Sequence, residues 1–282
     1  MSIVPSRRIF PVLCSLVLLA SASRAATLKE HFDKSFPLKA GSQLTLRNVN
    51  GGVKLEAWDR DEVRIEADKE VKAGTDSAAR KAMDQVRIDV TPGAGSLRIE
   101  THTPKRGESF WDAIFGNGIN YNVNYRIHVP RQAAVDAESV NGAVSLAGTH
   151  GKVRLGTTNG AVDVADVTGN VNAGTTNGGV TALRVAGAVK AETTNGAVEI
   201  DLTALPAGSD LSFESTNGGI HVRLPRDARL SVDAETTNGH VKSDFDVHGG
   251  KQGKHALKGD INGGGGKLSI HTTNGGIEIL AH

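Results

Sequence analysis

The chain has 282 residues and a formal net charge of +1 at pH 7, a balance that argues against nucleic acid or an anionic membrane as an electrostatic partner. Its 34 glycines, 8 prolines and 4% aromatic residues predict many tight turns around a thin core of small aliphatic side chains. The single cysteine excludes a disulfide framework.

The first 25 residues have the features of a secretory signal peptide. Arg7 and Arg8 form a basic start, residues 9–20 an apolar core, and Ser23-Arg24-Ala25 a cleavage site. The apolar run is shorter than the roughly 20 residues of a membrane-spanning helix, so we expect cleavage after Ala25. Cys14 is not placed for lipid attachment and leaves with the leader. The mature chain then has 29 basic and 31 acidic residues and no later membrane-spanning segment. We expect it in the periplasm or at the cell surface.

Residues 26–135 form a less regular first part of the mature chain. Alternating apolar residues predict a strand, a corner at Asn50-Gly51-Gly52 and further strands. Residues 76–85 are Ala-rich and predict one short helix, with Asp76 or Ser77 as its N-cap. Further strands are predicted at Val86–Val90, Leu97–Thr101 and Tyr121–Val129.

An aromatic cluster interrupts this pattern at Phe110, Trp111, Ile114 and Phe115. Exposed aromatic side chains are typical of a site that contacts a partner or a membrane surface. The alternative is a segment that folds back over an open end of the strand stack and covers its unpaired edges.

Residues 136–282 contain regular repeats. Between Gly142 and Gly196 a glycine recurs every nine residues, and each is followed by an apolar, polar, apolar triplet. This alternation predicts half-buried strands. Corners beginning with Asn-Gly alternate with corners of other composition, so the full period is 18 residues. No linker separates the two parts, and one continuous β-domain over residues 26–282 is expected.

The repeat predicts an all-β, solenoid-like stack with an 18-residue coil of two nine-residue half-turns. The alternative is an antiparallel meander, because Asn-Gly also favours hairpin turns. Two alternating corner types favour the solenoid. Its corner asparagines should stack in a ladder: Asn50, Asn141, Asn159, Asn177, Asn195, Asn217, Asn238 and Asn274. The last three follow at intervals of 22, 21 and 36 residues, which small loop insertions would explain.

The adjacent threonines before each corner allow two interpretations. They could form a flat face that binds ice or sugar, or they could serve the corner structurally. Because neighbouring strand residues point to opposite faces, the structural interpretation is favoured.

No catalytic or metal-binding pattern is evident. The histidines lack compact metal-ligand spacing, although stacking could bring His221 and His240 together. Asp163, Glu199 and Glu278 occupy outward strand positions within a mixed polar set, which is typical of a solvated face. The glycine-rich run at residues 262–266 lacks the rest of a phosphate-binding loop. We therefore expect no enzyme, no cofactor and no bound metal.

The motifs "VNGGVKLEAWDRDEVRIEA", "VPRQAAVDAESVNGAVSL" and the serial "TTNG" corners resemble the bacterial putative-adhesin family of β-strand-repeat proteins, a domain of unknown function. The resemblance covers nearly the whole mature chain and implies the fold and an extracytoplasmic location. It implies no catalytic residues.

The sequence favours a non-enzymatic, exported scaffold or adhesin-like binding protein whose partner is an envelope or surface protein or a glycan. One alternative is a structural solenoid that self-assembles through its end coils, with the C-terminal "IEILAH" as a pairing edge. A second is a polysaccharide-active β-helix enzyme, which would need an acidic and basic groove.

Overall fold

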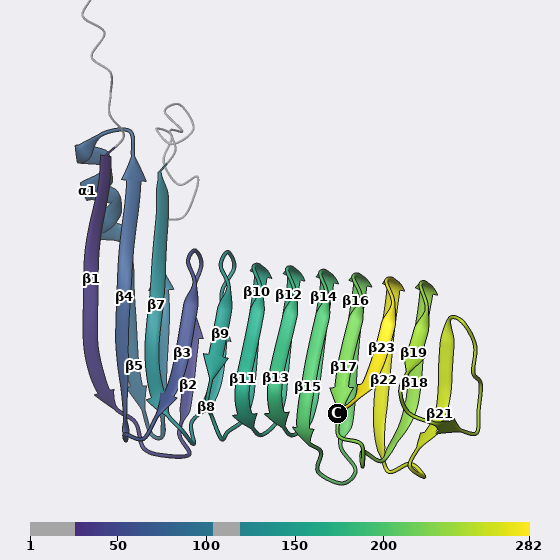
Figure 1. Cartoon of the computed structure of the whole chain (residues 1–282). Coiled ribbons are helices and arrows are strands. Elements are labelled where there is room, and N and C mark those ends of the chain that lie inside the picture. Colours follow the sequence, from purple (N-terminus) through teal and green to yellow (C-terminus); the bar gives the residue numbers. More distant parts are fainter. Residues whose placement is uncertain (1–25, 104–118) are drawn as a thin grey trace, which may run out of the picture.

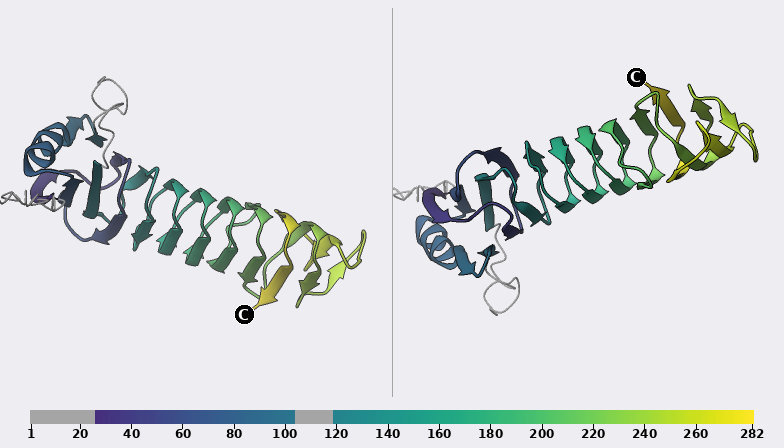
Figure 2. Two further views of the ribbon diagram at one scale, coloured as in Figure 1. Left: turned by 90° about the horizontal axis from the view of Figure 1, so that it is seen from above. Right: turned by 90° about the horizontal axis from the view of Figure 1, so that it is seen from below.

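Two stacked sheets form the molecule in a computed structural model that describes residues 26–103 and 119–282. Seen along the stack, the chain winds between the sheets coil by coil (Figure 1, Figure 2). Sheet A consists, in spatial order, of β1 (Ala26–Pro37), β4 (Glu62–Ala73), β7 (Asn120–Pro130), β3 (Val53–Trp58), β9 (Val144–Ala147), β11 (Val162–Thr168), β13 (Val180–Ala186), β15 (Val198–Ala204), β17 (Ile220–Leu224), β23 (Ile277–Ala281) and β19 (Val241–Ser243). Sheet B consists of β5 (Arg87–Gly93), β6 (Ser96–His102), β2 (Gln43–Arg47), β8 (Ala134–Glu138), β10 (Val153–Asn159), β12 (Val171–Asn177), β14 (Val189–Asn195), β16 (Asp210–Asn217), β22 (Gly266–Asn274), β18 (Leu230–Asn238), β21 (Ala256–Ile261) and β20 (Val247–His248).

The repeats stack as parallel strands. In sheet B, Val153 pairs with Val171 and Val171 with Val189, and β11 and β13 of sheet A pair with the same offset of 18 residues. Equivalent side chains therefore lie above one another. The all-β solenoid-like fold is confirmed, and the antiparallel meander is excluded for these repeats.

A thin aliphatic core fills the space between the sheets. Inward residues such as Val153, Leu155, Val162 and Val164 are at most 2% exposed, while the residues between them face solvent. Full burial of one such side chain stabilises the fold by about 1.5–3 kcal/mol. A short strand cannot gain this alone, so stacking on neighbouring coils stabilises each repeat.

Glycine is required where neighbouring coils meet at the asparagine corner. Gly178 has a φ of 152°. A Cβ atom at this position would lie 2.0 Å from the carbonyl oxygen of Gly160 in the neighbouring coil. The corner glycines thus set the close approach of the coils, which explains why the motif recurs.

The last coils do not follow chain order. The C-terminal pair β22 and β23 lies between β16/β17 and β18/β19. The 36-residue interval before Asn274 is therefore not a simple loop insertion, as the sequence suggested. It contains β20 and β21 and the return of the chain into the stack. The "IEILAH" segment is also not a free edge, because β23 has a paired neighbour on each side.

Antiparallel strands cover both ends of the stack. At the C-terminal end, β21 pairs antiparallel with β18 and with β20. At the other end, β1 and β4 in sheet A and β5 in sheet B are also antiparallel to their neighbours. Helix α1 (Asp76–Gln85) packs against β1 and β4 (Figure 1).

The N-cap of α1 is Thr75, not Asp76 or Ser77 as expected. Thr75 has extended backbone angles, and its hydroxyl accepts a hydrogen bond from the Ala78 amide at 3.2 Å. A β-branched threonine suits this extended geometry. Asp76 instead lies in the first turn, where its charge favours the helix dipole.

Candidate functional site

The outward face of sheet B carries a shallow hollow over β8, β10, β12 and β14. At one outward position these strands carry Glu138, Gly156, Gly174 and Glu192, which lie side by side in register. The two central strands therefore expose bare backbone, and the two outer strands raise carboxylates on either side. The hollow has a volume of about 460 Å³.

Polar side chains form the remaining walls of the hollow. Arg154, Asn172 and Lys190 line the side toward the strand starts, and Thr158 lines the side toward the corner. The lining thus combines cationic donors, an amide and a hydroxyl with the two carboxylates. Such a set can donate to and accept from one polar ligand.

The charged groups of the hollow differ in how they are paired. Glu138 lies 3.3 Å from Arg47 Nε and 3.6 Å from Arg154 Nε. Across residues 26–103 and 119–282, the side chains of Lys190 and Glu192 make no hydrogen bond or ion pair with another described side chain. Those two groups are exposed and available to a ligand.

The eight corner asparagines lie in one column beside this face. Each bonds to the next by an amide-to-carbonyl hydrogen bond of 2.7–2.9 Å, from Asn50 through Asn141, Asn159, Asn177, Asn195, Asn217 and Asn274 to Asn238. Asn274 precedes Asn238 because the C-terminal coil is inserted. At about 4.8 Å per strand, the column is roughly 34 Å long.

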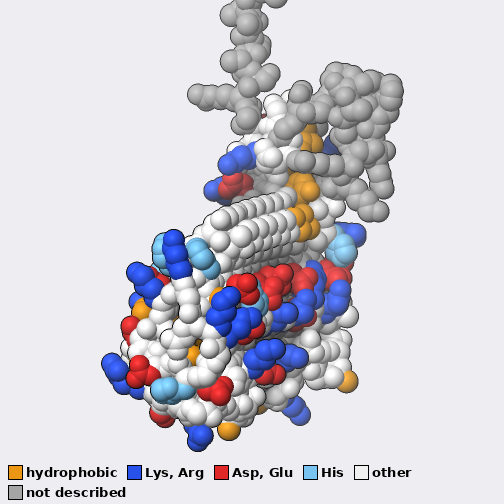
Figure 3. All heavy atoms as spheres, turned by 90° about the vertical axis from the view of Figure 1, so that its right-hand side faces the viewer, with side chains coloured by type: hydrophobic (Ala, Val, Ile, Leu, Met, Phe, Trp, Pro, Cys, Tyr) orange, Lys and Arg blue, Asp and Glu red, His pale blue; other side chains and the backbone are white. Residues whose placement is uncertain are grey.

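The two threonines before each corner have different roles. Thr175 and Thr193 are buried, and their hydroxyls donate to the carbonyls of Gly160 and Gly178 in the preceding coil at 2.9 and 2.8 Å. The second threonine of each pair is exposed. Together with the asparagines, the exposed threonines give a ridged strip without charged side chains, bordered by rows of charge (Figure 3).

Stacking does not bring His221 and His240 together. His221 faces Glu278 at 3.5 Å, whereas the ring of His240 lies 6.4 Å from that of His255. In the described part of the chain, no three or more His, Cys, Asp or Glu side chains are grouped to hold a metal ion.

The outward carboxylates of sheet A are mixed with cationic neighbours. Asp163, Glu199 and Glu278 share one row, interrupted by Thr181 and His221. Glu199 lies 3.5 Å from Arg223 Nη1. The row resembles a solvated face and does not form the acidic pair that glycoside hydrolysis uses.

Perturbed pKa values occur in ion pairs and in the core, away from the hollow. A hydrogen bond from Arg184 lowers the pKa of Asp166, and one from Arg131 lowers the pKa of Asp59. Burial raises the pKa of Tyr125 to about 12. These shifts accompany structural contacts.

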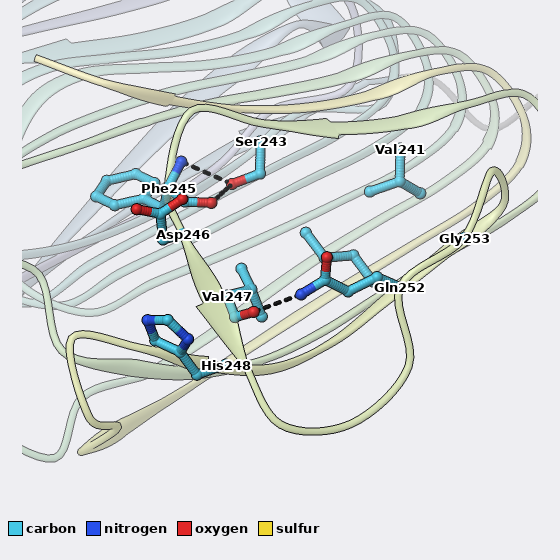
Figure 4. A pocket seen from close by; sticks show the side chains of 9 residues that line it. Val241, Ser243, Phe245, Asp246, Val247, His248, Gln252 and Gly253 are labelled. Atoms are coloured by element: carbon cyan, nitrogen blue, oxygen red, sulfur yellow. Dashed lines mark hydrogen bonds between the residues drawn. The ribbon is translucent and has the colours of Figure 1, made fainter.

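A second hollow, of about 320 Å³, opens at the C-terminal end of the stack. Val241, Phe245 and Val247 line it together with Ser243 and polar groups of the end loop (Figure 4). The amide of Gln252 donates to the Val247 carbonyl across it. This contact fixes the loop that covers the last coil.

The aromatic residues Phe110, Trp111, Ile114 and Phe115 lie outside the described residues, as does the expected leader. Sequence reasoning also missed the hollow. A signal for it exists: the residue before the threonine pair is Gly156 or Gly174 in two repeats but Glu192 in the next. The absent side chains become meaningful once the register places these positions together.

The geometry defines a β-solenoid-like protein with an open polar face. The family model Toastrack DUF4097 matches residues 37–280, so the chain belongs to this family. A comparison with curated proteins gives no match. In the described residues, no helix is long and apolar enough to cross a membrane.

Solved structures with similar folds come from several bacteria. A putative cell adhesion protein from Clostridium sporogenes is 14% identical, with a TM-score of 0.35 over 90% of this chain and 100% of that one. A putative adhesin from Bacteroides fragilis is 12% identical, with a TM-score of 0.48 over 89% and 97%. A putative lipid binding protein from Parabacteroides distasonis is 11% identical, with a TM-score of 0.36 over 89% and 96%. Because every one of these scores is below 0.5, the family assignment rests on the sequence model.

Proposed function

We propose that this chain is an exported, non-enzymatic protein of the cell envelope or surface that binds partners through its broad sheet faces, as an adhesin does. The observation that carries the proposal is the in-register stack, which displays long rows of outward polar side chains. β1 begins at Ala26, directly after the expected cleavage site, which supports removal of the leader.

A polysaccharide-active enzyme has less support. Catalysis by general acid and base needs groups that converge on one reacting bond. In the described residues, the outward carboxylates Glu199 and Glu278 lie beside Arg223 and His221. These are exposed surface pairs, and binding is the function that such a face supports best.

Self-assembly through the end coils also has less support. An end coil must present a free strand edge to another chain. At the C-terminal end, sheet B is covered by antiparallel β21 and β20, and sheet A ends in β19, which has three residues. A partner coil therefore finds no long parallel edge there.

We further propose that Phe110, Trp111, Ile114 and Phe115 provide a second contact region. The support is compositional, because aromatic side chains are enriched in binding surfaces and scarce elsewhere in this chain. A variant with all four residues replaced by serine tests this region separately from the sheet faces.

The test of the function uses mature chain 26–282 immobilised and exposed to envelope extracts, envelope vesicles and a glycan panel. Saturable binding to at least one component, with no turnover of polysaccharide substrates, is expected. Turnover that follows the protein through purification would contradict the proposal, as would absence of binding to every component. N-terminal sequencing of the protein recovered after export should begin at Ala26.

A further inference from the structure

The hollow on sheet B is a built break in an otherwise continuous row of side chains. Along the row, Glu138 on β8 and Glu192 on β14 project outward, whereas Gly156 and Gly174 between them carry no side chain. Three strand steps separate the two glutamates, or about 14 Å at 4.8 Å per step. The gap has the width of a small cyclic ligand, and its floor is peptide backbone.

Glycine is not required at these two positions by the fold. Neither Gly156 nor Gly174 has a positive φ. A Cβ atom at Gly174 would meet its nearest atom, the Glu192 carbonyl oxygen, at 3.7 Å, and one at Gly156 would meet Glu138 Cγ at 3.4 Å. Both are ordinary contacts, unlike those at the corner glycines. The stack would accept side chains here, so these glycines serve the open floor.

The charges around the floor balance one another. Arg154 and Lys190 supply two cations and Glu138 and Glu192 two anions. An anionic ligand would face both carboxylates, and a cationic ligand would face both cations, so the lining favours a ligand without net charge. The groups remain strong hydrogen-bonding partners, because ionised donors and acceptors bind hydroxyls more strongly than neutral ones do.

Hydroxyl groups of a ligand have matching partners on every side. Lys190 donates and Glu192 accepts, and neither is engaged by another described side chain. Asn172 and Thr158 can do both. A hydroxyl-rich ring lying on the glycine floor could satisfy its hydroxyls at the rim while its apolar face contacts backbone.

We propose that this hollow binds a neutral sugar unit. The inference rests on the proposed function and gives the class of ligand that the sheet B face would bind. The volume of about 460 Å³ lies within the range of small-molecule sites, roughly 300–1,000 Å³. Because the hollow is open along the sheet, it can accept a unit within a longer chain.

The test titrates mature chain 26–282 with neutral mono- and oligosaccharides and with uronic-acid counterparts, using calorimetry. Gly174→Gln fills the floor, and Ser145→Gln on β9 is its matched control on sheet A. Glu192→Gln removes a rim charge, and Glu214→Gln is its control in the same row beyond the hollow. Circular dichroism and urea midpoints establish that each variant is folded.

We expect binding of a neutral saccharide, at least tenfold weaker in Gly174→Gln and several-fold weaker in Glu192→Gln, with both controls unchanged. Affinity that rises with chain length assigns the sugar to a glycan, and equal affinity for the monosaccharide assigns it to a free sugar. Both results support the inference.

Unchanged affinity in Gly174→Gln, preference for the acidic saccharides, or no saccharide binding at all would overturn it. Binding to an envelope protein or vesicle in those cases leaves the proposed function standing. Only the loss of all envelope binding by the wild-type chain removes both.

Discussion

The corner glycine Gly178 offers a sharp test of coil stacking. In Gly178→Ala, the new Cβ atom would lie 2.0 Å from the Gly160 oxygen, whereas such contacts are not found below 3.0 Å. The two coils must therefore separate locally by about 1 Å. Several hydrogen bonds cross this interface: Gly160 N to Asn177 O at 2.9 Å, Val162 N to Gly179 O at 3.0 Å, and Thr175 Oγ1 to Gly160 O at 2.9 Å.

Each weakened hydrogen bond costs about 0.5–1.5 kcal/mol, and a side chain at positive φ adds about 1–2 kcal/mol. We expect Gly178→Ala to lower the free energy of unfolding by about 3–5 kcal/mol. Gly208→Ala is the matched control, since Gly208 has a φ of 75° but a Cβ atom there would have no neighbouring atom within 4 Å. It should cost only about 1–2 kcal/mol.

Urea unfolding followed by far-ultraviolet circular dichroism measures both variants, with the slope of the transition as a check on cooperativity. In a stacked protein a weakened interface can also broaden the transition. Equal losses in Gly178→Ala and Gly208→Ala would refute the idea that backbone contact between coils requires glycine.

Three further substitutions follow from the same structure. Asn177→Ala breaks two links of the asparagine column and should cost about 1–2 kcal/mol in urea unfolding, whereas the outward Asn172→Ala should change stability by less than about 0.5 kcal/mol; equal effects would argue that the column is not stabilising. Thr193→Val removes the buried hydroxyl that donates to Gly178 O and should lower the thermal midpoint by about 2–4 °C per kcal/mol lost, while the exposed Thr194→Val should leave it unchanged. Burial raises the pKa of Tyr125 to about 12, so its contribution is complete below about pH 10 and is lost as pH rises toward 12, about 3 kcal/mol in all. Urea midpoints from pH 9 to 12 should therefore fall less steeply in Tyr125→Phe, and parallel curves would contradict this assignment.

Much of the fold could be predicted from the sequence because the repeat encodes its own register. Residues such as Val153, Val171 and Val189 are equivalent by spacing, and stacking places them side by side. The asparagine corners can be located for the same reason. The composition of helix α1 predicts the helix itself, although its cap lies one or two residues earlier than the sequence indicates.

The order of the last coils could not be predicted. The corners at Asn217, Asn238 and Asn274 have nearly the same local sequence, so each pair of coils would fit equally well by local chemistry. What decides the order is that β21 pairs with the outer edge of β18. The following strand β22 must then use the inner edge, between β18 and β16.

The candidate site escapes sequence reasoning because its signal is an absence. Gly156 and Gly174 look like ordinary turn-forming glycines in a chain with 34 of them. Only the paired register shows that they face outward on adjacent strands between two glutamates.

Disulfide formation between engineered cysteines tests the stacked order most directly, since the chain from Ala26 onward contains no cysteine. Ser215 and Asn217 pair with Thr272 and Asn274, so Thr216 and Thr273 lie on neighbouring strands about 4.8 Å apart, within disulfide range. Thr216 and Thr237 are two strands apart, at roughly 10 Å. The structure predicts rapid intramolecular oxidation of the T216C/T273C variant and none of T216C/T237C, and the reverse result would contradict the inserted C-terminal coil.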